Sequence, residues 1–293
     1  MSHCPWLPAT AHTVFSSEPD RPFGRLLIVI SRRALLVGGG VGTAGLAVGA
    51  VVERTRLRRI LGWTGPDGVV PSVPPDPVSV TRRQSSARGC SVDVVTMNGT
   101  AGFPVCVVLH GRGNTARGMI TLGLPQFLAA AKARFTMVAV DGGDSYWVPR
   151  TPSDDPQRML REELPGWLRD LGLGEARAVL GISMGGFGGL VYARAAGLPA
   201  AVLSPALFRS WDDAATVGAF ASEAQWSSYE PLRHSPPSRL GVWCGEEDPF
   251  CDAARELAPH AEVAAFDHGE HTDGYWRRVL PDAIGYLGKV LAY

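Results

Sequence analysis

The alternation of short apolar runs with amphipathic stretches is the feature that most limits what this chain can fold into. Two of the runs, 105–109 and 136–140, are apolar at nearly every position instead of at alternate ones. Strands of this kind are buried on both faces, as in a parallel sheet covered by helices on both sides. The alternation therefore predicts a doubly wound α/β fold, in which functional residues lie at the carboxyl ends of the strands.

The same pattern sets the order of the elements. The strands are expected at 78–83, 91–96, 105–110, 136–141, 176–182, 200–204, 240–245 and 262–266. The helices are expected near 115–132, 157–171, 184–196, 250–258 and 274–291. The stretch between 204 and 240 contains Trp211, Phe220, Trp226 and Tyr229 and predicts a small helical cap beside the cleft.

The first 63 residues form an N-terminal extension of different character. Paired Arg32 and Arg33 precede the run 34–52, which has no charged residue and is rich in glycine. This pattern is typical of a twin-arginine export signal, and the run is also long enough to anchor the chain in a membrane. Either interpretation predicts an exported protein of the cell envelope, membrane-anchored or secreted. The arginines that follow directly, between 54 and 59, favour a cytoplasmic flank and complicate both interpretations.

Residues 64–77 are rich in proline and glycine and predict a linker to the α/β domain, 78–293. Within the whole chain, 28 basic residues balance 28 acidic ones, so charge gives no indication of a nucleic acid partner. The five cysteines include no C-x-x-C pair and no cluster with histidine, so neither a metal site nor a cofactor is predicted. Cys244 and Cys251 are the best candidates for a disulfide among Cys90, Cys106, Cys244 and Cys251, and free buried thiols are an equal alternative.

A serine lies at the turn between an expected strand and an expected helix. The sequence Gly-Ile-Ser-Met-Gly at 181–185 matches G-x-S-x-G. In this context the motif predicts a strained elbow that presents the Ser183 hydroxyl above the sheet as a nucleophile. The alternative is an ordinary glycine-rich turn in which Ser183 caps the helix.

A serine nucleophile needs a histidine base and a carboxylate that orients it, and in this fold they follow in the order acid, then histidine. His268 and His271 both follow the last expected strand, and His271 is preferred because it lies at the apex of the loop. Asp248 is the preferred acid because it closes the loop after the strand 240–245. The alternative acids are Glu246, Glu247 and Asp252.

The loop after the strand 105–110 reads His-Gly-Arg-Gly-Asn. Acyl transfer produces an oxyanion, which this fold stabilises with two backbone N–H groups. Met184 is expected to supply one of them, and Arg112 or Gly111 the other. His110 is expected to hold the loop instead of acting on substrate. Tyr146 and Trp147, after the next strand, either line a substrate pocket or pack a loop over the core.

Taken together, these motifs resemble the branch of the α/β-hydrolase superfamily that contains esterase D and the antigen 85 mycolyltransferases. The resemblance spans about 78–291 and is based on LHGRGN at 109–114, DGGDSYW at 141–147, GISMGG at 181–186, CGEEDPF at 244–250 and GEHTDGYW at 269–276. It implies Ser183 as nucleophile, Asp248 as acid and His271 as base, and it favours His271 over His268. The acid departs from the glutamate expected of the mycolyltransferases.

The leading hypothesis is therefore an exported serine carboxylic ester hydrolase that acts on small-molecule or lipid esters through an acyl-enzyme. An acyltransferase with the same triad is the second hypothesis. A non-catalytic binding protein of the cell envelope is the third, because a fold alone does not establish activity.

Overall fold

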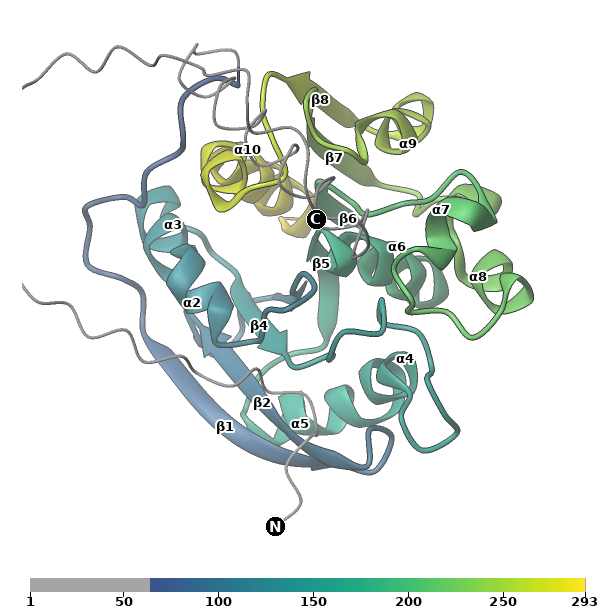
Figure 1. Cartoon of the computed structure of the whole chain (residues 1–293). Helices are drawn as coiled ribbons and strands as arrows, with labels where there is room; N and C mark the ends of the chain where they lie inside the picture. Colours follow the sequence, from purple (N-terminus) through teal and green to yellow (C-terminus); the bar gives the residue numbers. More distant parts are fainter. Residues whose placement is uncertain (1–63, 293) are drawn as a thin grey trace, which may run out of the picture. The chain divides into compact units, whose positions relative to one another are not determined.

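The runs that are apolar throughout form the centre of a sheet. The computed structural model describes residues 64–292, and in this part of the chain an eight-stranded sheet has the order β1-β2-β4-β3-β5-β6-β7-β8 (Figure 1). β1 pairs antiparallel with β2, and β2 with β4, whereas all the other pairs are parallel. The strands are β1 (Val78–Ser85), β2 (Cys90–Met97), β3 (Val105–Leu109), β4 (Thr136–Val140), β5 (Ala176–Ile182), β6 (Ala200–Leu203), β7 (Leu240–Gly245) and β8 (Val263–Asp267).

All eight predicted strands are present. Every residue of β3, β4, β6 and β7 is buried, as expected for strands covered on both faces. Successive side chains of β3 enter opposite cores: Val107 and Leu109 belong to one, and Cys106 and Val108 to the other. The doubly wound α/β prediction is confirmed.

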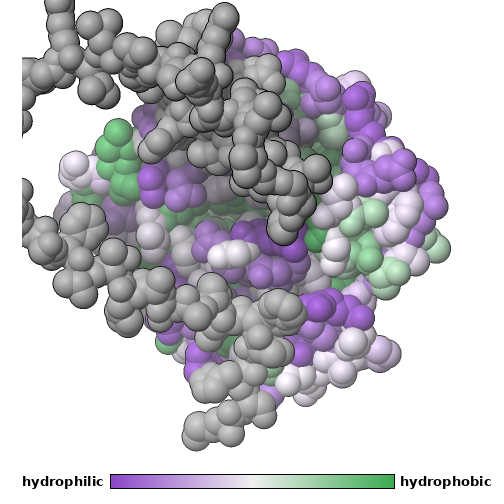
Figure 2. Space-filling view, viewed as in Figure 1, coloured by the Kyte–Doolittle hydropathy of each residue, from purple (hydrophilic) through white to green (hydrophobic). Residues whose placement is uncertain are grey.

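Helices fill both layers. They are α2 (Gly118–Leu122), α3 (Leu124–Ala131), α4 (Pro156–Arg158), the π-helix η1 (Met159–Glu163), α5 (Leu164–Asp170), α6 (Met184–Ala196), α7 (Trp211–Ala215), α8 (Glu223–Tyr229), the 3₁₀-helix η2 (Pro231–Arg233), α9 (Cys251–Arg255), the 3₁₀-helix η3 (Ala258–His260) and α10 (Asp273–Leu291). Buried residues of α2, α3 and α10 pack on one face of the sheet, and those of α5, α6 and α9 on the other. The surface seen in Figure 2 is largely hydrophilic, with smaller hydrophobic patches.

Three of the predicted helices differ in the structure: two are interrupted and one is shorter. The stretch 115–132 is divided into α2 and α3 at Gly123, whose φ of 103° ends the first helix, and Pro125 then lies in the first turn of the second. The stretch 157–171 is interrupted by the π-helix η1, and Pro165 lies in the first turn of α5. The stretch 250–258 ends early, at Arg255.

Residues 64–77, predicted as a linker, make hydrogen bonds to the α/β domain. This segment runs past α10 and α3 (Figure 1), where Gly68 N–H donates to Gly274 O at 2.7 Å and Asp76 N–H donates to Pro125 O at 3.2 Å. Arg278 of α10 donates to the carbonyl oxygens of Thr64 and Pro66. The prolines of residues 64–77 hold this segment extended. Partners in α10 and α3 satisfy the N–H and C=O groups of the segment that are named above. We name residues 64–68 the N-terminal strap.

The disulfide predicted between Cys244 and Cys251 is absent. Among the described residues, Cys106, Cys244 and Cys251 are free thiols, and these three and Cys90 are all buried. Burial raises the pKa of the Cys244 thiol well above its ordinary value. Both members of the predicted pair belong to the hydrophobic core, where a thiol packs as a small apolar group.

The predicted export signal and the possible membrane segment 34–52 lie outside the described residues. Within 64–292, no helix combines the length and the hydrophobicity that crossing a bilayer requires.

Candidate active site

The turn from β5 to α6 is strained at Ser183, the residue between the two elements. Its φ of 57° and ψ of −121° are unusual for a residue with a side chain. The elements on either side approach too closely for larger residues: a Cβ at Gly185 would overlap the carbonyl oxygen of Leu109, and one at Gly181 would overlap that of Gly185. The glycines therefore permit a tight turn that holds the Ser183 hydroxyl at the carboxyl end of the sheet.

Ser183, His271 and Asp248 form one hydrogen-bonded chain. Ser183 Oγ lies 2.8 Å from His271 Nε2, and His271 Nδ1 lies 2.8 Å from Asp248 Oδ2. The second oxygen of the carboxylate accepts Phe250 N–H at 2.9 Å, which fixes the orientation of Asp248. A carboxylate that accepts from Nδ1–H leaves Nε2 free to take a proton from the serine hydroxyl. This arrangement can generate an activated nucleophile.

Aromatic rings hold the imidazole on two sides. Phe250 and Trp276 each contact His271 at a centroid distance of 5.2 Å, with interplanar angles of 63° and 86°. Such edge-to-face contacts are favourable and limit rotation of the ring. No role for Phe250 beside the histidine was predicted from the sequence. Phe250 lies two residues after Asp248 and Trp276 five residues after His271, and this proximity in sequence to the predicted acid and base is the signal that could have suggested both contacts.

The alternative site residues have other partners. His268 is exposed and its Nδ1 lies 2.8 Å from Glu247 Oε1, which raises the pKa of His268 through a hydrogen bond to the charged carboxylate. The other oxygen of Glu247 accepts Gly269 N–H at 2.6 Å. Glu246 pairs with Arg255 at 3.0 Å. Asp252 is exposed on α9. Of the candidates, the structure brings Asp248 and His271 to Ser183.

The loop from β3 packs directly against the nucleophile. A Cβ on Gly111 would lie 3.2 Å from Ser183 Cβ. Within the described residues, the backbone N–H groups of Arg112 and Met184 donate no hydrogen bond to protein, so both are available to a substrate oxygen. An amide from this loop and one from the residue after the serine are the two groups expected of an oxyanion site.

Buried polar contacts hold this loop in place. His110 Nδ1–H donates to Gly111 O at 2.8 Å, and His110 Nε2 accepts Gly142 N–H at 3.0 Å, which assigns a neutral imidazole. Burial lowers the pKa of His110, in agreement with that assignment. Asp144 Oδ1 accepts Gly113 N–H at 2.7 Å. The holding role predicted for His110 agrees with these contacts, whereas the sequence analysis missed that of Asp144.

A cavity of about 250 Å³ opens beside the serine. It is lined by Gly111, Arg112, Asn114, Met119, Leu122, Ile182, Ser183, His271, Asp273 and Trp276. Its walls come from α2 and α10 as well as from the two loops that adjoin Ser183. In the described part of the chain, no group of histidine, cysteine, aspartate or glutamate side chains is arranged to hold a metal ion.

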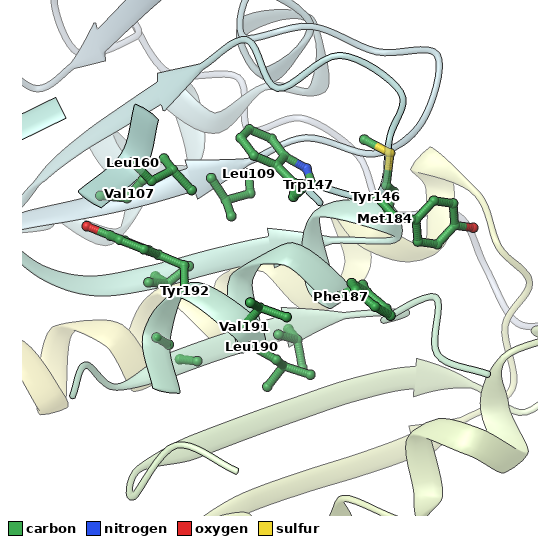
Figure 3. Close-up of a cluster of buried hydrophobic side chains, with 14 of the residues drawn as sticks. Val107, Leu109, Tyr146, Trp147, Leu160, Met184, Phe187, Leu190, Val191 and Tyr192 are labelled. Carbon is green, nitrogen blue, oxygen red and sulfur yellow. The ribbon is translucent and has the colours of Figure 1, made fainter. Parts of the chain in front are cut away.

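Tyr146 and Trp147 are not among the residues that line this cavity, and the packing alternative describes them better. Both belong to a cluster of buried side chains (Figure 3). Their φ values are 55° for Tyr146 and 58° for Trp147. The Trp147 indole N–H donates to His110 O at 3.2 Å, so this ring supports the loop that precedes Gly111. Tyr146 packs between the rings of Phe187, Phe208 and Phe220.

The stretch predicted to form a small helical cap contains α7, α8 and η2, and none of its residues is among those that line this cavity. A buried carboxylate, Glu230, organises this stretch by accepting hydrogen bonds from Phe208 N–H, from the Trp226 indole N–H and from Leu232 N–H. Burial raises the pKa of Glu230 to about 7. The sequence around Glu230 does not indicate this role, because a glutamate at the end of a short helix is usually exposed to solvent.

The fold and this constellation define the class: the chain has an α/β-hydrolase fold. Its structure is similar to an S-formylglutathione hydrolase from Agrobacterium tumefaciens (TM-score 0.62, 14% identity, covering 73% of this chain and 95% of that one). It is also similar to MPT51 from Mycobacterium tuberculosis (TM-score 0.59, 19% identity, 74% and 99%). A third similar structure is the carboxylesterase EstE1 from a metagenomic library (TM-score 0.58, 16% identity, 85% and 98%).

These neighbours confirm the resemblance to the esterase D and antigen 85 branch at the level of fold. Identities this low carry no assignment of substrate. No protein-family model and no curated protein sequence matches the chain.

Proposed function

We propose that the protein is a serine carboxylic ester hydrolase in which Ser183, His271 and Asp248 act as a catalytic triad. The observation that carries the proposal is the continuous hydrogen-bonded chain from Ser183 Oγ through His271 to Asp248, with both links at 2.8 Å. The structural neighbours include an S-formylglutathione hydrolase and a carboxylesterase, which agrees with the proposal.

In the first half of the proposed reaction, Ser183 Oγ attacks the ester carbonyl carbon while His271 Nε2 takes the hydroxyl proton. The carbonyl oxygen becomes an oxyanion and accepts hydrogen bonds from the Arg112 and Met184 N–H groups. Asp248 holds the imidazole in the required tautomer and stabilises the imidazolium. The C–O bond to the alcohol then breaks, and His271 returns the proton to the leaving oxygen.

In the second half, water enters and gives a proton to His271 as its oxygen attacks the acyl carbon. The bond from that carbon to Ser183 Oγ breaks, Oγ regains the proton, and the carboxylic acid leaves. No cofactor is needed, because the two half-reactions are balanced by water and by the proton that His271 carries.

The test is hydrolysis of p-nitrophenyl esters of increasing acyl length by the full chain. We expect activity that is reduced at least 10³-fold in Ser183→Ala, since the nucleophile is lost. The matched control is Ser238→Ala, because Ser238 is exposed ahead of β7, at the opposite end of the strand from the site. A folded chain without activity on any ester, or one that Ser183→Ala leaves active, contradicts the proposal.

We also propose that the chain is exported, on the basis of Arg32-Arg33 and the apolar run 34–52. Replacing both arginines by lysine should retain the protein in the cytoplasm of a bacterial host that has the twin-arginine pathway. Equal export of the wild type and the variant contradicts this proposal.

A further inference from the structure

The cavity beside Ser183 has one apolar side. Met119 and Leu122 of α2, Ile182 at the end of β5 and Trp276 of α10 contribute its hydrophobic wall. A cavity of about 150 Å³ is known to accommodate benzene, so a cavity of about 250 Å³ suits a group of roughly ten non-hydrogen atoms. A short acyl or aryl group therefore fits against this wall.

The rim of the cavity is polar and carries Arg112, Asn114 and Asp273. The negative charge of Asp273 is already compensated, since its carboxylate lies 3.6 Å from the Arg277 guanidinium and in the first turn of α10. Asp144, the carboxylate that contacts the same loop, accepts Gly113 N–H.

The positive charge of Arg112 has no such compensation. Among residues 64–292, its exposed side chain forms no ion pair and no hydrogen bond. The side-chain oxygen of Asn114 accepts Thr115 N–H at 2.8 Å, and within the same residues its amide NH₂ donates to no acceptor. The rim therefore presents a guanidinium and an amide NH₂, both donors without acceptors, next to the serine.

A planar guanidinium fork matches the two oxygens of a carboxylate, and a charge-assisted hydrogen bond is stronger than a neutral one. The backbone N–H of Arg112 is also placed to donate to the oxyanion. The side chain of Arg112 therefore extends from a position that borders the reacting ester. A carboxylate bound by Arg112 would thus belong to the molecule whose ester bond reacts.

We propose that the preferred substrates are short esters that carry a carboxylate in either the acid or the alcohol half, and that Arg112 determines this specificity. The inference rests on the proposed hydrolase function. Asn114 supplies a second donor to the same group, and the apolar wall receives the uncharged part of the substrate.

The test uses the full chain and two pairs of substrates, each an acid and its methyl ester. Mono-p-nitrophenyl adipate and p-nitrophenyl methyl adipate place the charge in the acid half. 4-(Butyryloxy)benzoate and its methyl ester place it in the alcohol half. The measured quantity is the ratio of kcat/KM for the acid to that for its methyl ester, with the spontaneous rate subtracted.

We expect a ratio of about ten or more in at least one pair, and a fall of about tenfold in Arg112→Gln. Arg112→Lys keeps the charge and should retain part of the preference. Asp273→Asn should change the ratio much less than Arg112→Gln does, because Arg277 already compensates the charge of Asp273. The matched control is Arg134→Gln: this arginine is exposed just before β4, away from the cavity, and the ratio should stay at the wild-type value. Added salt should reduce the ratio, since it screens exposed charges.

A wild-type ratio near one in both pairs overturns the proposal, and so does a high ratio that Arg112→Gln leaves unchanged. If the methyl esters are hydrolysed and Ser183→Ala abolishes that activity, the hydrolase function stands and only the specificity is wrong. A folded chain that hydrolyses neither member of either pair contradicts the function and this proposal together.

Discussion

The Asp248 carboxylate has no exposed surface and lies 2.8 Å from Nδ1 of His271. Because Phe250 N–H fixes the orientation of this carboxylate, its other oxygen faces His271 and sets which nitrogen of the imidazole carries the proton. The proposed reaction requires the proton on Nδ1, because Nε2 must accept from Ser183.

Asp248→Asn should lower kcat for a p-nitrophenyl ester by about 10³- to 10⁴-fold, because an amide NH₂ in place of the carboxylate favours the wrong tautomer. The measurement is steady-state hydrolysis, with thermal unfolding recorded to verify that the variant folds. Asp252→Asn, an exposed aspartate on the neighbouring α9, is the control and should keep wild-type activity. Equal activity of wild type and Asp248→Asn would remove Asp248 from the triad.

Asp144 should act as a positioning residue through the loop that carries Arg112. Asp144→Ala removes the acceptor of Gly113 N–H, so the neighbouring oxyanion amide becomes less well placed. We expect kcat to fall about tenfold, with a smaller change in KM, because the amide acts on the transition state. Asp170→Ala removes an exposed carboxylate whose ion pair, in the described part of the chain, is with Arg83, and it should leave both constants unchanged. A change in KM alone would assign Asp144 to substrate binding instead.

The N-terminal strap should support the loop that carries His271. Arg278 donates hydrogen bonds both to strap carbonyls and to the carbonyl oxygen of His268. A Cβ on Gly68 would overlap the backbone of Arg278, so Gly68→Val should displace the strap. We expect a lower melting temperature and a lower kcat for the full-length variant.

The control for the strap variant is Gly285→Ala. Gly285 lies on α10, the helix that contains Arg278, and an added Cβ there meets no atom within 4 Å. This variant should be as stable as wild type or more stable, since alanine is favoured over glycine in a helix by about 1 kcal/mol. Wild-type stability and activity in Gly68→Val would show that the strap contacts contribute nothing.

Glu230 should make stability depend on pH. Its pKa is raised by burial from 4.5 to about 7, so the folded chain keeps a proton that the unfolded chain releases. The free energy of unfolding should therefore decrease as pH rises from about 4.5 to 7, by about 3 kcal/mol from this group.

Urea unfolding across this range should show the decline in wild type and a weaker one in Glu230→Gln. Glu223→Gln, at the exposed start of α8, should behave as wild type. An identical pH dependence in Glu230→Gln and wild type would show that Glu230 is not the group responsible.

The sequence was most informative where local patterns decide the structure. Strands such as β3 and β4 follow from runs of apolar residues, and the turn at Ser183 follows from glycines that only a tight strand–helix connection requires. The histidine was harder, because His268 and His271 share one loop: the position of His271 at the loop apex favoured it, and the resemblance strengthened that preference. The division between α2 and α3 could have been predicted from Gly123 and Pro125.

Other features depend on tertiary packing that no local pattern encodes. The cavity wall combines Leu122 with Trp276, which are distant in sequence and meet only when α2 and α10 pack on the same face of the sheet. Whether Trp147 lines a pocket or supports a loop depends on where the His110 carbonyl lies. Likewise, the composition of the strap predicts a linker, and its hydrogen bonds to α10 become evident only in the folded structure.

The most direct test of the account is to look for the acyl-enzyme. The full chain is mixed with a p-nitrophenyl ester, quenched in acid during turnover, digested and analysed by mass spectrometry. We expect one acyl group on the peptide that contains Ser183, and none in Ser183→Ala. An acyl group on another residue, or rapid hydrolysis with no acylated peptide at any time, would contradict it.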